Sequence, residues 1–168
     1  MQSEYAMKCS QSLIKKYHTR NPFEIADRLG VEVIMTDSLK KLKGFYRVVK
    51  RNRYIILNSK NSARMNRIVC AHELGHDQLH RELAKDDSLN EFTLYDMASR
   101  TEYEANVFAA NLLLDDNNVL DMIYDGYDIV QIAVATSSDI NLVALKVDCL
   151  RSEGYDLRRQ DHYSKFLK

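Results

Sequence analysis

The segment from residue 68 to residue 80 reads Ile-Val-Cys-Ala-His72-Glu73-Leu-Gly-His76-Asp-Gln-Leu-His80. It contains the pattern His-Glu-x-x-His, and in a helix two histidines four residues apart lie on the same face, so both rings can reach one ion. They would be two of the three protein ligands that a catalytic zinc takes. Glu73 lies beside the pair, displaced along the helix, in the position of a general base that takes a proton from water.

The same segment has the sequence of a helix, because its apolar residues can form one side of it. Gly75 costs about 1 kcal/mol in a helix interior. A glycine between the two histidines therefore suggests that backbone or substrate comes close at this point. The alternative is an ordinary amphipathic helix whose histidines are packed or solvated, and a third ligand would argue against it.

The third ligand is expected on a second helix, within residues 100–114. Its apolar and small residues share one stripe with Glu102, whose carboxylate would then face the first helix. Glu104 is two residues further, roughly 200° round the helix, and is expected to face elsewhere. Asn106, one turn after Glu102, could accept a hydrogen bond from a ligand imidazole and fix its tautomer. Taken alone, Glu102 could equally be a solvated acid.

His80 repeats the four-residue spacing and has to be considered as a further ligand. His72 and His80 are roughly 12 Å apart along a straight helix, so three histidines of one helix cannot close on one ion. We therefore expect His80 either to end the helix or to contact a metal ligand without binding the ion itself.

These residues carry a resemblance. His72-Glu-Leu-Gly-His76 followed by Leu79-His80, and later Glu102-x-x-Ala105-Asn106-x-Phe108, resembles the ImmA/IrrE family of metallopeptidases. The resemblance implies a gluzincin-like zinc endopeptidase with His72, His76 and Glu102 as ligands and Glu73 as base. It also implies a protein substrate, usually a helix-turn-helix repressor of a phage, mobile element or stress regulon. The layout is closest to the anti-repressor members.

Length and composition fit a globular enzyme. The chain has 168 residues, of which 45% are hydrophobic and 29% charged, with one proline and three widely spaced cysteines. No apolar run approaches the ~18 residues of a membrane span, and the start lacks a signal pattern. We expect a cytoplasmic protein with reduced thiols and no membrane partner.

The pattern of the chain predicts an α+β fold. Strands are expected at 31–35, 45–49 and 53–57, forming a small, mostly antiparallel sheet packed on an active-site helix at 63–80. Helices are also expected at 4–17, from 22 to about 29, at 117–124, 128–136 and 139–151. The division expected is a metallopeptidase core at 1–116 and a helical C-terminal subdomain at 117–168. Residues 85–96, between the ligand helices, are expected to form a lid, a substrate rim or a short strand.

Three functions follow, in order of preference. The first is zinc-dependent cleavage of a repressor, with one Zn²⁺ ion that Mn²⁺ or Fe²⁺ could replace at a His/His/Glu site. The second is an anti-repressor that docks on its partner without cutting it. The third is DNA binding by the two C-terminal helices, which resemble a helix-turn-helix but lack the basic excess that phosphate binding needs. Direct nucleic-acid binding is therefore not expected.

Overall fold

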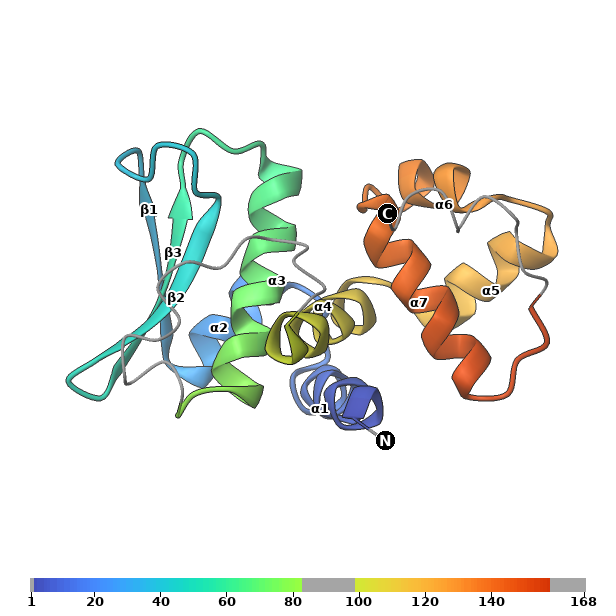
Figure 1. Ribbon diagram of the computed structural model, residues 1–168, viewed down its shortest axis with the longest axis horizontal. Coiled ribbons are helices and arrows are strands. Elements are labelled where there is room, and N and C mark those ends of the chain that lie inside the picture. The colour runs from blue at the N-terminus through green and yellow to red at the C-terminus, as the bar shows by residue number, and fades with distance from the viewer. Residues whose placement is uncertain (1, 83–98, 158–168) are drawn as a thin grey trace.

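The structure, a computed structural model, describes residues 2–82 and 99–157. Within these ranges the elements follow in the order α1 (Gln2–Tyr17), α2 (Pro22–Leu29), β1 (Val31–Thr36), β2 (Gly44–Val49), β3 (Asn52–Asn58), α3 (Ala63–Leu79), α4 (Arg100–Leu113), α5 (Asp116–Tyr124), α6 (Ile129–Ala135) and α7 (Ile140–Ser152). The sheet lies on one side with α3 against it, and α5, α6 and α7 are grouped on the other side (Figure 1). The predicted α+β class is confirmed.

The sheet has the strand order β1-β3-β2 and is evenly mixed, whereas the sequence suggested a mostly antiparallel one. β2 and β3 form the expected hairpin, but β3 then lies between β2 and β1 and runs parallel to β1. The hairpin turn consists of Lys50 and Arg51, both with positive φ (48° and 73°), a conformation usually supplied by Asn-Gly. The sheet packs closely on α3, since a Cβ at Gly44 would lie 2.6 Å from Val69 Cγ1.

Asp77 holds α3 in register with the sheet. It is fully buried, and its carboxylate accepts hydrogen bonds from the Tyr46 hydroxyl of β2 at 2.7 Å and from Arg53 Nη1 of β3 at 2.9 Å. Arg53 also donates to the carbonyl of Leu29 at the end of α2. The helix itself begins after Ser62, whose hydroxyl accepts from the Met65 amide at 3.1 Å.

Helix α4 is the central element of the described fold. It contacts α1, α3 and α7, and every residue from 105 to 113 is buried. The sequence predicted a single apolar stripe facing α3. A helix surrounded by others must instead carry, on all sides, either apolar side chains or polar side chains with hydrogen-bond partners. Its approach to α3 is close: a Cβ on Gly75 would lie 3.2 Å from both the Cα and the carbonyl oxygen of Ala105 and 3.2 Å from Phe108 Cδ1. The close approach expected at Gly75 is that of the α4 backbone.

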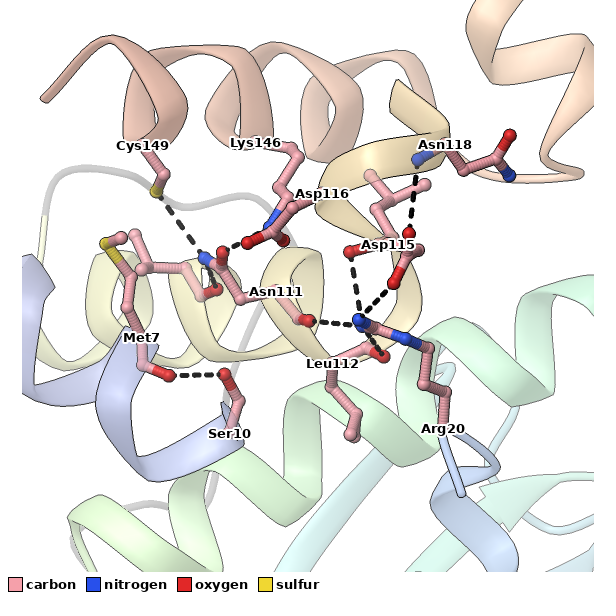
Figure 2. Close-up of polar contacts among 12 residues, drawn as sticks. Met7, Ser10, Arg20, Asn111, Leu112, Asp115, Asp116, Asn118, Lys146 and Cys149 are labelled. Carbon is pink, nitrogen blue, oxygen red and sulfur yellow. Dashed lines mark hydrogen bonds and ion pairs between the residues drawn. The ribbon is translucent and has the colours of Figure 1, made fainter. Parts of the chain in front are cut away.

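Two cations join α4 to the rest of the chain (Figure 2). Arg20, after α1, donates from Nη1 to carbonyls at the C-terminal end of α4, including Asn111 at 3.0 Å, and from Nη2 to Asp115 at 2.7 Å. Lys146 of α7 is 1% exposed, and its ammonium donates to the Asn111 side chain at 2.7 Å and to Asp116. Because a buried charge is stable only when it is partnered, these contacts attach α7 and the start of α5 to α4.

The C-terminal helices α5, α6 and α7 follow the boundaries expected from the sequence within two residues. Arg64, near the start of α3, donates to the carbonyl of Ser138 between α6 and α7. The division of the chain at residue 116 stays a prediction. Among the described residues no single helix has the length and apolar character of a membrane span, although α6 and α7, bent by 112°, meet that test as a pair.

Gly75→Ala tests the close approach of α3 and α4. In an unconstrained helix this change stabilises by about 1 kcal/mol. Here the added methyl group would lie 3.2 Å from the Ala105 backbone and the Phe108 ring, and we expect overpacking of about 1–3 kcal/mol to outweigh that gain. Urea denaturation should therefore show a net loss of stability. A more stable variant would contradict the packing described.

Asp116→Ala tests the partner of the buried lysine. We expect a loss of about 1–3 kcal/mol, because among the described residues the ammonium of Lys146 then keeps only Asn111 as a side-chain partner. Asp121→Ala, at an exposed position of the same helix, should change stability by no more than about 0.5 kcal/mol. In a Lys146→Met background the cost of Asp116→Ala should fall. Equal losses for Asp116→Ala in both backgrounds would show that the ion pair is not the cause.

Candidate metal centre

His72, His76 and Glu102 converge on one point between α3 and α4. The Nε2 atoms of the two histidines are 3.0 Å apart. Glu102 Oε2 lies 3.1 Å from His72 Nε2, and Glu102 Oε1 lies 3.2 Å from His76 Nε2. All three side chains are buried, and their ligand atoms lie within 4.8 Å of one another. This is the set of residues that the sequence proposed, and the structure brings it together from two helices.

The spacing of these atoms fits a small divalent ion. For tetrahedral zinc with bonds of about 2.0–2.1 Å to nitrogen and oxygen, neighbouring ligand atoms are about 3.3 Å apart, and the three contacts here are 3.0–3.2 Å. The donor set fits as well. Both oxygens of Glu102 are buried, and within the described ranges they have no hydrogen-bond donor unless one of the facing imidazoles carries a proton on Nε2. A cation satisfies all three groups together, because two imidazole lone pairs and a carboxylate then share one positive charge.

The electrostatics of the group favour a cation. Burial raises the pKa of Glu102, but hydrogen bonds to His72 and His76 lower it more, to about 2. Burial also lowers the pKa of His76 to about 4, which leaves this ring neutral near pH 7. For His72, burial lowers the pKa, but the hydrogen bond to Glu102 and the charge of Glu73 raise it above its ordinary value. The group thus holds an ionised carboxylate, a neutral imidazole and an imidazole that attracts a proton. A metal ion can take the place of that proton.

Glu73 lies beside this group and outside it. Its carboxylate is buried and accepts a hydrogen bond from the Tyr46 backbone amide of β2, and Oε2 has no hydrogen-bond partner among residues 2–82 and 99–157. Burial raises the pKa of Glu73 to about 7, while the charge of His72 opposes the rise and that of Glu102 adds to it. A carboxylate with a pKa near the working pH can both accept and return a proton.

The contact expected for Asn106 is present. Its side-chain oxygen lies 3.0 Å from His72 Nδ1 at a fully buried position, so it accepts from an Nδ1–H and, in the neutral ring, leaves Nε2 with the lone pair that can bind a metal ion. His80 is not part of the converging group; its Nδ1 lies 3.1 Å from His76 Nδ1. Glu104 points away from the group, as expected, and its Oε2 accepts from His80 Nε2 at 2.9 Å.

Sequence reasoning missed two positions near the centre. Asp77 fixes α3 on the sheet. The one sign of this in the sequence was its place one turn after Glu73, on a helix that proved to be buried. The bond between Glu104 and His80 had no signal, because the two residues are 24 positions apart. The expected lid or rim at 85–96 lies outside the described residues.

Comparison with known proteins identifies the family. The IrrE N-terminal-like domain, which defines a peptidase family, matches residues 26–146 and so includes the whole converging group. The chain belongs to this family. It is 40% identical over 136 residues to the uncharacterized immunity region protein 2 of Bacillus phage phi105, across 81% of this chain and 85% of the relative. It is 30% identical over 106 residues to metallopeptidase ImmA of Bacillus subtilis (strain 168), across 63% of this chain and 61% of ImmA.

The family match confirms the resemblance stated from the sequence and the enzyme class it implied. The chain is an ImmA-like metallopeptidase domain with a candidate His-Glu-x-x-His metal site. The roles of the individual residues are tested by the variants that follow.

Glu102→Ala should remove bound zinc, because two histidines alone leave the ion without its third protein ligand and its only charged one. Glu104→Ala, on the same helix, removes an acid that is not a ligand, so it should weaken binding at most and still keep one zinc per chain. The measurement is metal content after dialysis, by elemental analysis of folded protein. Loss of zinc in Glu104→Ala together with retention in Glu102→Ala would mean that the other acid is the ligand.

Proposed function

We propose that the chain is a zinc-dependent endopeptidase whose substrate is a helix-turn-helix transcriptional repressor. The observation that carries the peptidase is the convergence of His72, His76 and Glu102 on one point with the buried carboxylate of Glu73 beside it. A structural zinc has four closed protein ligands and no use for a base, whereas three ligands and an adjacent carboxylate are typical of a hydrolytic site.

An ion bound here supplies a Lewis acid, which polarises a peptide carbonyl and increases the acidity of water. His72, His76 and Glu102 hold that ion, and Asn106 keeps the lone pair of His72 directed at it. Glu73 takes the proton of the attacking water and passes it to the leaving amine as the peptide bond breaks. Because Glu73 Oε2 is buried and has no partner in the described part of the chain, its carboxylate is available for this transfer.

The substrate is proposed to bind along β2. This strand is at one edge of the sheet, and its Tyr46 amide donates to Glu73. An extended peptide that pairs with a free sheet edge gains main-chain hydrogen bonds. At this edge it would pass directly beside the proposed base, which supports cleavage of an internal bond in an extended segment.

The repressor is proposed from the relatives and not from the geometry. One relative is an immunity region protein of a phage and another is named metallopeptidase ImmA. The family resemblance associates such chains with repressors of phages and mobile elements. Cleavage of a repressor would relieve repression of the genes it controls.

Glu73→Gln should retain zinc and lose cleavage. The amide has nearly the same shape but cannot accept the proton, and loss of a general base costs roughly 10²–10⁴-fold in rate. The assay is co-expression with the helix-turn-helix repressor encoded nearest the gene, followed by intact mass of the repressor. A fragment with the wild type and none with Glu73→Gln is the expected result. Cleavage by the variant at the wild-type rate would refute this mechanism.

The same assay separates the docking alternative. Exposed apolar side chains on and around α5 and α6 could take part in docking: Tyr124, Tyr127, Val130 and Val134. If the repressor stays intact and co-purifies equally with wild type and Glu73→Gln, the chain acts by binding and the proposed proteolysis is wrong.

A further inference from the structure

A chain of hydrogen bonds leads from His76 away from the converging group. His76 Nδ1 and His80 Nδ1 are 3.1 Å apart. His80 Nε2 lies 2.9 Å from Glu104 Oε2, and the other oxygen of Glu104 accepts from Arg100 Nε at 2.9 Å. The side chain of His80 is 6% exposed and that of Glu104 13%, whereas that of Arg100 is 68% exposed. The network therefore runs from the buried centre to the surface and joins the end of α3 to the first turns of α4.

The chemistry of these groups fixes the position of each proton. An ionised carboxylate only accepts, so Glu104 requires a proton on His80 Nε2. A neutral His80 then has a lone pair on Nδ1, and the short contact to His76 Nδ1 requires His76 to carry its proton there. His76 is left with its lone pair on Nε2, the atom that faces His72 and Glu102.

We propose that Glu104 is a positioning residue for the metal site, because it sets the tautomer of His80 and through it that of His76. This inference rests on the proposed metal-binding function of His76. It gives each ligand histidine its own support: Asn106 of α4 orients His72 directly, and Glu104 of the same helix orients His76 through His80. Glu104 is thus not a ligand. It acts on His76, the ligand histidine that Glu102 also contacts.

Three features of the network argue for this role over simple capping of α3. The His80 ring is aligned at both nitrogens, although a helix end needs only backbone partners. Glu104 is bound at both oxygens, which holds its carboxylate in place. The two supports of the ligand histidines lie on one helix, so the α4 segment that supplies Glu102 also orients both rings.

The test compares zinc affinity by competition with a chromophoric chelator for the wild type, Glu104→Leu, Glu104→Gln and the exposed control Glu153→Leu. Removing a group that orients a metal ligand usually costs 10–100-fold in affinity, and Glu104 acts through one intermediate, so we expect a loss of about tenfold for Glu104→Leu. Glu104→Gln should restore affinity to within about threefold of the wild type, because the amide oxygen still accepts from His80. Glu153→Leu should match the wild type.

A spectroscopic measurement on the zinc-loaded protein keeps the test independent of activity. In ¹⁵N-histidine spectra, the Nδ1–H of His76 should be a hydrogen-bonded, slowly exchanging signal in the wild type and in Glu104→Gln, and it should be lost in Glu104→Leu. If Glu104→Leu does not fold, His80→Phe removes both ring nitrogens while keeping a ring, and a loss of at least the same size is expected.

Wild-type affinity and an unchanged His76 signal in Glu104→Leu would overturn the proposal. A Glu104→Gln variant as weak as Glu104→Leu would also overturn it, because the effect would then come from charge and not from the tautomer. Failure of the wild type itself to bind zinc would refute the metal site. A repressor left uncut by zinc-loaded wild type would refute the proposed proteolysis, and the expected affinity differences would still support the role of Glu104.

Discussion

The distance between α3 and α4 at Gly75 is the constraint on which the site depends. At this position α3 presents no side chain, and the backbone of Ala105 and the ring of Phe108 come within 3.2 Å of where a Cβ would lie. Glu102 is one turn before Ala105, so the close contact of the two helices carries its carboxylate to within 3.2 Å of both histidines. A wider separation would leave two histidines on one helix and an acid on another without a common ion.

Helix α4 is buried, and yet it uses polar side chains to contact both the metal site and the C-terminal helices. Asn106 faces His72, and Asn111 faces Lys146 on the opposite side of the fold. Each buried amide has a specific partner, so neither imposes the cost of an unpaired polar group. The result is a helix without a solvent face along residues 105–113 that nevertheless contacts the metal site at one end and the C-terminal helices at the other.

Much of this arrangement could be predicted from the sequence, because the decisive signals were local. The four-residue spacing of His72 and His76 requires one helix face, and Glu102 and Asn106 are one turn apart on a helix that is recognisable from its own residues. The sequence could not predict that β3 lies between β2 and β1, since a hairpin pattern leaves the third strand free to join either edge. Nor could it predict the bond from Glu104 to His80, which depends on how two distant helices cross.

Because its proposed ligands come from both α3 and α4, the site couples the ion to the integrity of the core. An ion that binds the folded chain and not the unfolded one adds RT ln(1 + [L]/Kd) to stability, about 4 kcal/mol when its free concentration is 1,000 times the dissociation constant. For a domain whose total stability is about 5–15 kcal/mol, that share is large. The supply of metal in the cell would then govern two properties of the protein: its own resistance to degradation by other proteases, and its ability to cleave a substrate.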